Sequence, residues 1–199
     1  VLYVGDVNYN KNILTLIKAC KKADIPLVIC GKQAMEIEDK GMGLDTLNGP
    51  QDWIRFLFNI PHPELAHYEK LVDHFRVNPK IIRLGFVPDE DLVAIYNLAT
   101  LYCQPSHYEG FGLPVLEAMA CGTPVVASKI QAHTEIAEGK VLFAKPKSVK
   151  DFVDKISNLA KNTKLQKELV SKGRAHVKNF SWKKTAEKTL KVYKEVVSE

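Results

Sequence analysis

Short apolar runs alternate with longer helical patterns along most of this chain, and this alternation constrains the fold more than any other feature. Runs rich in Val, Ile and Leu predict strands, and most of the stretches between them repeat apolar residues with a helical period. Because parallel neighbours must be joined by a crossover, usually a helix, the pattern predicts an α/β fold with a parallel sheet covered on both faces. The expected strands are Val1–Gly5, Pro26–Cys30, Lys80–Leu84, Leu101–Gln104, Pro124–Ala127 and Val141–Ala144.

Helices are expected between and after these strands. The predicted helices are Asn12–Ala23, Glu64–Arg76, Asp89–Ala99, Leu113–Cys121, Val149–Lys161, Lys164–Lys178 and a last one capped by Ser181. In this last helix an apolar stripe that includes Trp182 and Tyr193 must pack either on this domain or on one beyond the chain.

One segment, Lys32–Arg76, breaks the alternation as a long excursion between the second and third strands. Excursions of this length are often functional or mobile. Its apolar run Trp53–Phe58 is expected to pack back on the domain rather than bind a partner.

The composition is typical of a soluble globular protein, and 199 residues suit one domain. The net charge of +5 is spread as lysines over helix faces, which argues against a nucleic-acid-binding stripe and is compatible with a small anionic ligand. No apolar run approaches the roughly 18 residues of a membrane span, and no signal peptide is visible. The isolated cysteines predict buried free thiols in a reduced, cytoplasmic compartment: Cys20, Cys30, Cys103 and Cys121.

A glycine-rich turn, Gly110-Phe111-Gly112-Leu113-Pro114, follows the fourth strand and leads into a predicted helix. Glycine permits close approach of the backbone to a ligand, and proline suits the first turn of a helix. The free N–H groups at a helix start bind anions, most often phosphate. The alternative is that these glycines only make a tight strand-to-helix turn.

Two carboxylates, Glu109 and Glu117, flank this turn with seven residues between them. Glu117 lies near the first helical turn and suits vicinal hydroxyls, such as a ribose diol. Glu109 follows a strand, at the edge where ligands bind in open α/β sheets. Either could be an ordinary glutamate, but together with the turn they suit a ligand with a central diphosphate and hydroxyl-rich groups on both sides.

These residues carry a resemblance to a known family. The string Ser106–Val126 resembles the Glu-x7-Glu signature of the retaining glycosyltransferases of group 1 (family 4), which have the two-domain GT-B architecture. Further blocks match in order: Val1-Leu2-Tyr3-Val4-Gly5 with Lys11-Asn12, Leu84-Gly85-Phe86-Val87 with Leu92, Tyr96 and Ala99, Gln104-Pro105-Ser106, and Phe180-Ser181-Trp182.

The resemblance covers nearly the whole chain. It implies that residues 1–199 form one nucleotide-sugar-binding domain, a Rossmann-like sheet of about six strands followed by C-terminal helices, as one half of GT-B. Since the chain opens at Val1 directly within a predicted strand, we expect a fragment of a longer enzyme that lacks its N-terminal acceptor domain.

The resemblance also implies roles for the matching residues. Lys11 would contact the donor diphosphate, Glu117 the ribose hydroxyls, and Glu109 the transferred sugar and the charge that develops on it, so Lys11 and Glu109 are the implied catalytic residues. The alternative for Lys11 is a surface lysine, and for Gly85–Val87 it is ordinary core packing. The other implied donor-binding residues are Gly5, Gly85, Phe86, Val87, Gly110, Phe111, Gly112, Leu113, Pro114 and Val115.

Two positions depart from the family pattern. Asp6 stands where members commonly have an arginine that contacts the diphosphate, and Thr134-Glu135 stands where many have Pro-Glu. The first departure puts the full cationic clamp in doubt.

The implied activity is transfer of a glycosyl group from a UDP or GDP sugar with retained configuration, in polysaccharide biosynthesis, without a metal or other cofactor. The acceptor would be a glycan, a lipid or another hydroxyl compound on the missing domain, through which the protein could also touch the inner face of the membrane. The isolated fragment is expected to be inactive. Alternatives are a non-catalytic nucleotide-binding or assembly module, and a GT-B-like epimerase or phosphorylase. His67, His107 and His133 fit no metal-ligand spacing and are interpreted as surface or loop histidines.

Overall fold

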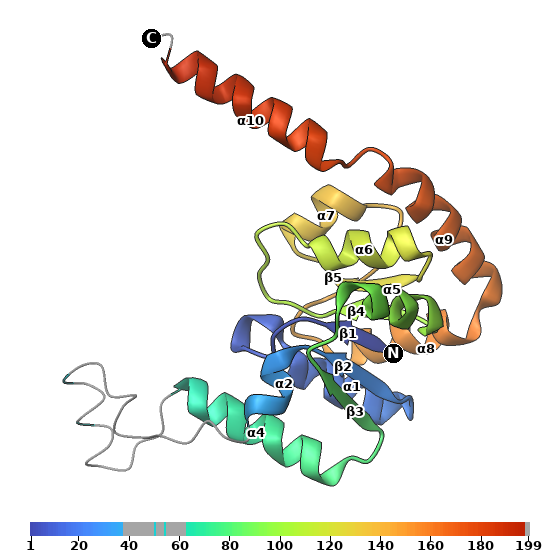
Figure 1. Ribbon diagram of the computed structural model, residues 1–199. Helices are drawn as coiled ribbons and strands as arrows, with labels where there is room; N and C mark the ends of the chain where they lie inside the picture. The colour runs from blue at the N-terminus through green and yellow to red at the C-terminus, as the bar shows by residue number, and fades with distance from the viewer. Residues whose placement is uncertain (38–49, 51–53, 55–62, 198–199) are drawn as a thin grey trace.

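The computed structural model describes residues 1–37, 50, 54 and 63–197, and in this part of the chain six parallel strands form one sheet (Figure 1). The strands run in the order β3-β2-β1-β4-β5-β6. Their bounds are β1 Leu2–Val4, β2 Leu27–Cys30, β3 Ile81–Gly85, β4 Tyr102–Gln104, β5 Val125–Ser128 and β6 Leu142–Ala144. The predicted α/β class and all six predicted strands are confirmed, each within one or two residues of its predicted ends.

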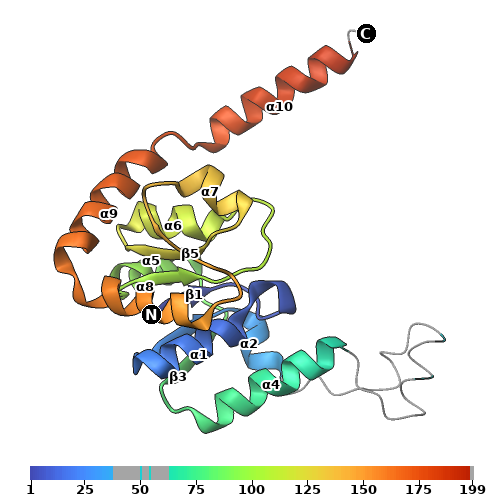
Figure 2. The same ribbon diagram turned by 180° about the vertical axis from the view of Figure 1, so that it is seen from behind.

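Helices cover both faces of this sheet. On one side α1 packs against α8 and α4, and on the other α6 packs against α5, α7 and α9 (Figures 1 and 2). These helices are α1 Ile13–Ala23, α4 Pro63–Val77, α5 Asp89–Leu98, α6 Leu113–Cys121, α7 Gln131–Ala137, α8 Val149–Lys161 and α9 Thr163–Val177.

Successive residues of each strand serve opposite faces, as the twofold period of a strand requires. Leu2 and Tyr102 belong to the hydrophobic cluster under α5, α6 and α7. Tyr3 and Cys103 belong to the cluster under α1, α4 and α8. Strands buried on both faces explain why the sequence showed continuous apolar runs instead of alternation.

The strand order reverses between β1 and β4. From β1 the chain proceeds outward through β2 and β3, and then returns to β4 on the other side of β1. In open α/β sheets this reversal opens a crevice at the carboxyl ends of the two central strands, where ligands bind. The fold therefore places the segments after β1 and β4 at the natural ligand-binding edge.

Three short elements were not predicted: the 3₁₀ helix η1 (Tyr9–Lys11), α2 (Lys32–Glu36) and α7. They are too short to show a helical period in sequence. Apart from residue 54, the run Trp53–Phe58 lies outside the described residues, so its expected packing stays a prediction.

Two of the histidines interpreted as surface or loop residues are buried, which corrects that interpretation. The exposed fractions of His67 and His133 are 6% and 0%. Each ring donates one hydrogen bond to a backbone carbonyl: His67 Nε2 to Val7 O at 3.0 Å, and His133 Nδ1 to Ser128 O at 2.9 Å. Such bonds offset the free-energy cost of burying an imidazole, and they cannot be recognised from a sequence pattern.

The cysteines are free thiols, as predicted, and all are buried except Cys121, which is partly exposed. The last helix, α10 (Trp182–Val197), extends away from the sheet and has no buried residue (Figures 1 and 2). Its apolar stripe was expected to pack either on this domain or on one beyond the chain. In the described structure it does not pack on this domain.

Candidate functional site

The centre of the site is an ion pair between two residues that are 98 positions apart. Lys11 ends η1, just after β1, and Glu109 follows β4. Lys11 Nζ lies 2.9 Å from Glu109 Oε1 and 3.0 Å from Oε2. The two residues named as catalytic from the sequence are thus in contact, at the strand reversal.

Glu109 is held from two further directions. Ser106 Oγ and Gln104 Nε2 each donate a hydrogen bond of 2.7 Å to Glu109 Oε1. Burial by itself would raise the pKa of the Glu109 carboxyl, but the hydrogen bonds from Ser106 and Lys11, the charge of Lys11 and the bond from Gln104 together lower it. Glu109 is therefore an ionised, oriented carboxylate at neutral pH.

The sequence did not predict that Gln104 and Ser106 bind Glu109; they were recognised only as residues that precede the signature. Both are buried, with exposed fractions of 1% and 0%. A polar pair at the end of an apolar strand was the available signal, since buried polar side chains need partners.

Asn12 fixes the loops around this pair and was also missed. It adopts a left-handed conformation (φ 56°) between η1 and α1. Its Nδ2 donates to Pro105 O at 2.9 Å and to Pro146 O at 2.8 Å, which joins the loops after β1, β4 and β6. A third bond, from His107 N to Asn10 O at 2.8 Å, joins the first two of these loops. The edge of the sheet is preorganised by these bonds.

The glycine turn leads directly into α6, as predicted. The helix begins at Leu113, one residue before Pro114, and Gly112 is its N-cap with φ 104°. A Cβ at Gly112 would lie 3.1 Å from both His133 Cδ2 and Ile136 Cδ1, so glycine is needed for conformation and for space. At this helix start Pro114 has no N–H and Val115 N donates to Gly112 O at 3.0 Å, so Leu113 N is the donor of the first turn that can face an anion, together with the helix dipole.

Glu117 lies one turn further along α6 and is exposed. Tyr96 OH donates to Glu117 Oε2 at 3.1 Å. Burial and the nearby Glu117 carboxylate raise the pKa of Tyr96, so this phenol keeps its proton and acts as the donor. Glu109 and Glu117 thus have separate partners and separate surroundings.

The remaining predicted residues border the same edge. Gly5 N donates to Cys30 O at 2.9 Å and Gly31 N to Gly85 O at 2.8 Å, so the ends of β1, β2 and β3 are linked. Phe86 is 75% exposed, whereas Val87 packs on the cluster under α5. The predicted residues of the glycine turn are mixed in exposure: Gly110, Phe111 and Leu113 are exposed, Pro114 is partly exposed, and Gly112 and Val115 are buried.

His133 supports the turn from below. Its Nδ1 carries the proton donated to Ser128 O, and burial lowers its pKa, so Nε2 is a neutral acceptor. Within the described residues Nε2 has no hydrogen-bond partner.

Across residues 1–37 and 63–197, no group of three or more His, Cys, Asp or Glu side chains is close enough together to bind a metal. No described helix is both long enough and apolar enough to cross a bilayer.

Known proteins are similar to this chain in sequence and fold. The family model described as "Glycosyl transferases group 1" matches residues 1–176. O-antigen chain mannosyltransferase B of Escherichia coli is 31% identical over 199 residues, covering 97% of this chain and 45% of that protein. Sucrose-phosphate synthase of Thermosynechococcus elongatus is 27% identical with a TM-score of 0.71, over 99% of this chain and 45% of that one.

The fold is also similar to that of Anabaena HepE, which was solved in complex with UDP and glucose. Its TM-score is 0.70 at 18% identity, over 98% of this chain and 47% of that one. The chain spans about half the length of these proteins.

Proposed function

The chain belongs to the glycosyl transferases of group 1, and on that premise we propose that it is the donor-binding half of a retaining glycosyltransferase. The donor would be a UDP or GDP sugar bound in the crevice between β1 and β4. The observation that carries the proposal is the Lys11–Glu109 pair beside the N-terminus of α6, because it joins a cation, a carboxylate and a helix-end anion site at the strand reversal.

In this role the donor diphosphate lies against the N-terminus of α6, where the Leu113 N–H and the helix dipole face it. Lys11 adds a point charge while it keeps its contact with Glu109. Because the ion pair has no net charge, fixed dipoles supply much of the stabilisation of the leaving diphosphate. Glu117, oriented by Tyr96, accepts hydrogen bonds from the ribose hydroxyls.

Glu109 serves the sugar. Its carboxylate accepts a hydrogen bond from a sugar hydroxyl and stabilises the positive charge that develops at the anomeric carbon. The acceptor hydroxyl attacks from the face that the diphosphate leaves, which retains the configuration. The separate partners of Glu109 and Glu117 argue against the acid–nucleophile pair of a retaining hydrolase, whose two carboxylates act on one bond.

Titration of the protein with UDP and GDP sugars tests the proposal. Glu117→Ala should weaken binding of the matching nucleoside diphosphate by about tenfold, because a charged acceptor is lost. Glu109→Gln should weaken binding of the nucleotide sugar more than that of the nucleoside diphosphate. Glu187→Ala, an exposed change on α10, is the control. Absence of binding by every UDP and GDP compound, or equal affinities in Glu117→Ala and Glu187→Ala, would contradict it.

A further inference from the structure

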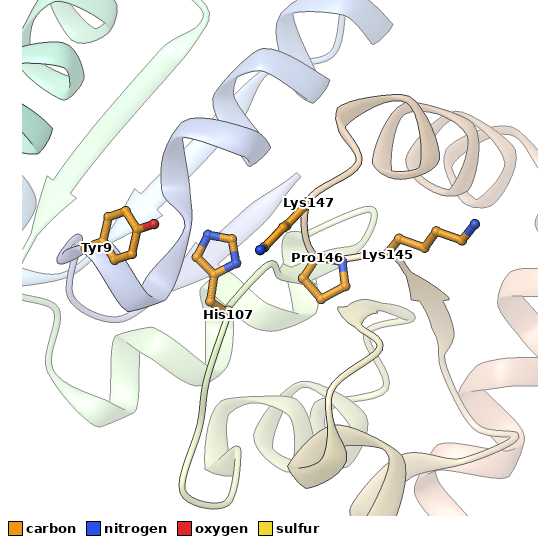
Figure 3. Close-up of a pocket in the computed structure, with 5 residues that line it drawn as sticks. All are labelled: Tyr9, His107, Lys145, Pro146 and Lys147. Carbon is orange, nitrogen blue, oxygen red and sulfur yellow. The ribbon is translucent and has the colours of Figure 1, made fainter.

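A cavity of about 520 Å³ lies between three loops at this edge of the sheet, and none of the residues assigned to the donor lines it (Figure 3). Residues from the loops after β1, β4 and β6 line it: Tyr9, His107, Lys145, Pro146 and Lys147. Its size is that of a small-molecule site. Tyr9 precedes Lys11 by two residues and His107 precedes Glu109 by two, so two walls of the cavity belong to the loops that carry this ion pair.

Hydrogen bonds and ring contacts hold the walls of this cavity in place. The buried Asn12 amide holds the loop after β4 and the loop after β6 at Pro146 O. Tyr9, although 67% exposed, is held by two rings: its centroid lies 5.7 Å from that of His67 in an edge-on arrangement and 5.7 Å from that of His107 at a tilt of 40°. These two contacts favour one orientation of the Tyr9 ring.

The charge of the cavity is positive. Neither Lys145 nor Lys147 forms an ion pair among the described residues, and no carboxylate lines the cavity. The nearby Asp151 is engaged at the start of α8, where its Oδ2 accepts from Lys145 N at 2.7 Å. Burial, together with the charge of Lys147, lowers the pKa of His107, so this imidazole is neutral at pH 7.

The two lysines differ in direction. The ammonium of Lys147 points toward the His107 ring, whereas the side chain of Lys145 extends away from the other lining residues (Figure 3). Lys147 is thus the cation available to a ligand in the cavity, and Lys145 is a matched neighbour that is not.

We propose that this cavity binds a phosphorylated sugar, with the phosphate on Lys147 and the sugar ring against Tyr9 and His107. A phosphate pairs with a lysine as a point charge, and the apolar face of a sugar ring packs on aromatic rings. A role for this ligand as the glycosyl acceptor rests on the proposed donor function. In that step a hydroxyl oxygen of the sugar bonds to the anomeric carbon of the donor, the bond from that carbon to the diphosphate oxygen breaks, and the hydroxyl proton passes to the diphosphate.

Binding is tested with glucose 6-phosphate, glucose and inorganic phosphate, each titrated into the 199-residue chain by calorimetry. We expect glucose 6-phosphate to bind more tightly than either part alone. Lys147→Met should weaken it by about fivefold to tenfold, and Lys145→Met by less than about twofold. Equal losses in the two variants would indicate a diffuse lysine surface, and phosphate that binds as tightly as glucose 6-phosphate would exclude a sugar site; either result overturns the proposal.

A second readout is local to the cavity. The pKa of His107, followed by NMR, should rise on addition of glucose 6-phosphate, because an anion beside the ring offsets the charge of Lys147. Glucose should leave it unchanged. No change with glucose 6-phosphate at saturation would place its binding elsewhere and overturn the proposal.

The two sites can fail separately. Lys147→Met should leave the affinity for UDP or GDP unchanged, and Glu117→Ala should leave that for glucose 6-phosphate unchanged. If nucleotides do not bind while glucose 6-phosphate does, the donor proposal and the acceptor role fail and the sugar-phosphate site stands. If Lys147→Met weakens nucleotide binding as much as sugar-phosphate binding, the cavity is part of the donor site and the separate site is refuted.

Discussion

At the scale of single residues, the balance of charge around the proposed donor site sets this chain apart from the family pattern. Lys11 is neutralised by Glu109, whose carboxylate also receives bonds from Gln104 and Ser106. Asp6, exposed at the end of β1, adds a negative charge where family members commonly carry an arginine. Under the proposed function, a diphosphate would therefore meet less positive charge here than the family pattern provides.

Asp6→Arg should tighten the binding of UDP or GDP by about twofold to fivefold, since a repulsive charge becomes an attractive one at an exposed site. The backbone carbonyl of Asp6 accepts from Tyr3 OH, and this bond survives the substitution. The gain should shrink in high salt because exposed charges are screened. Calorimetric titration measures it, with Glu69→Arg on α4 as a control of equal charge change. Unchanged or weaker binding would show that Asp6 does not face the diphosphate.

Gly112→Ala should destabilise the fold by about 1–3 kcal/mol. The new Cβ would press on the buried side chains of His133 and Ile136, and the positive φ of residue 112 disfavours any side chain there. The neighbouring Gly110 is the control: a Cβ there would meet no atom within 4 Å. Thermal unfolding should show a lower Tm for Gly112→Ala only. Equal Tm values for the two variants would mean that the turn adapts freely to a side chain.

At the scale of elements, the sequence was informative wherever burial imposes a pattern. Strands such as Leu27–Cys30 and helices such as Val149–Lys161 were predicted almost to the residue, because apolar periodicity records what each element packs against. The seven residues of α7 make too few turns to show a period.

Within the site, too, some residues could be predicted from the sequence and others could not. Glu109, Glu117 and the glycine turn were found from a local string, whereas contacts across the chain were not readable. Asn12 reaches carbonyls 93 and 134 residues away, and His133 lies under a turn that precedes it by about twenty residues. Spacing along a chain carries no information on such tertiary contacts.

The element α10 contributes nothing to the packing of the described domain, since none of its residues is buried. Removal of residues 182–199 should therefore change the Tm by less than about 2 °C, as expected for surface changes. Removal of 163–199 should lower it markedly, because Leu169 of α9 is buried and Gly173 packs on Met119 of α6. A large drop in Tm for the shorter deletion would show that α10 stabilises the domain.

At the scale of the whole molecule, every group that the proposed function assigns to the donor comes from one sheet edge and the loops that border it. The chain spans about half the length of its relatives, and a transferase must close a second surface over the donor to exclude water and orient the acceptor. We therefore predict that the 199-residue chain binds the nucleotide sugar but does not transfer its sugar.

This prediction is checked by incubating the chain with the nucleotide sugar that binds best and with candidate hydroxyl acceptors, and by assaying glycosylated product and free sugar separately. Bound donor without either product is the expected result, because one open sheet edge does not align an acceptor hydroxyl with the anomeric carbon, even when an acceptor is bound nearby. Free sugar alone would mean that water reaches that carbon in the open site. Glycosylated product at rates typical of transferases, about 1 per second or more, would show that this half contains a complete active site and would refute the prediction.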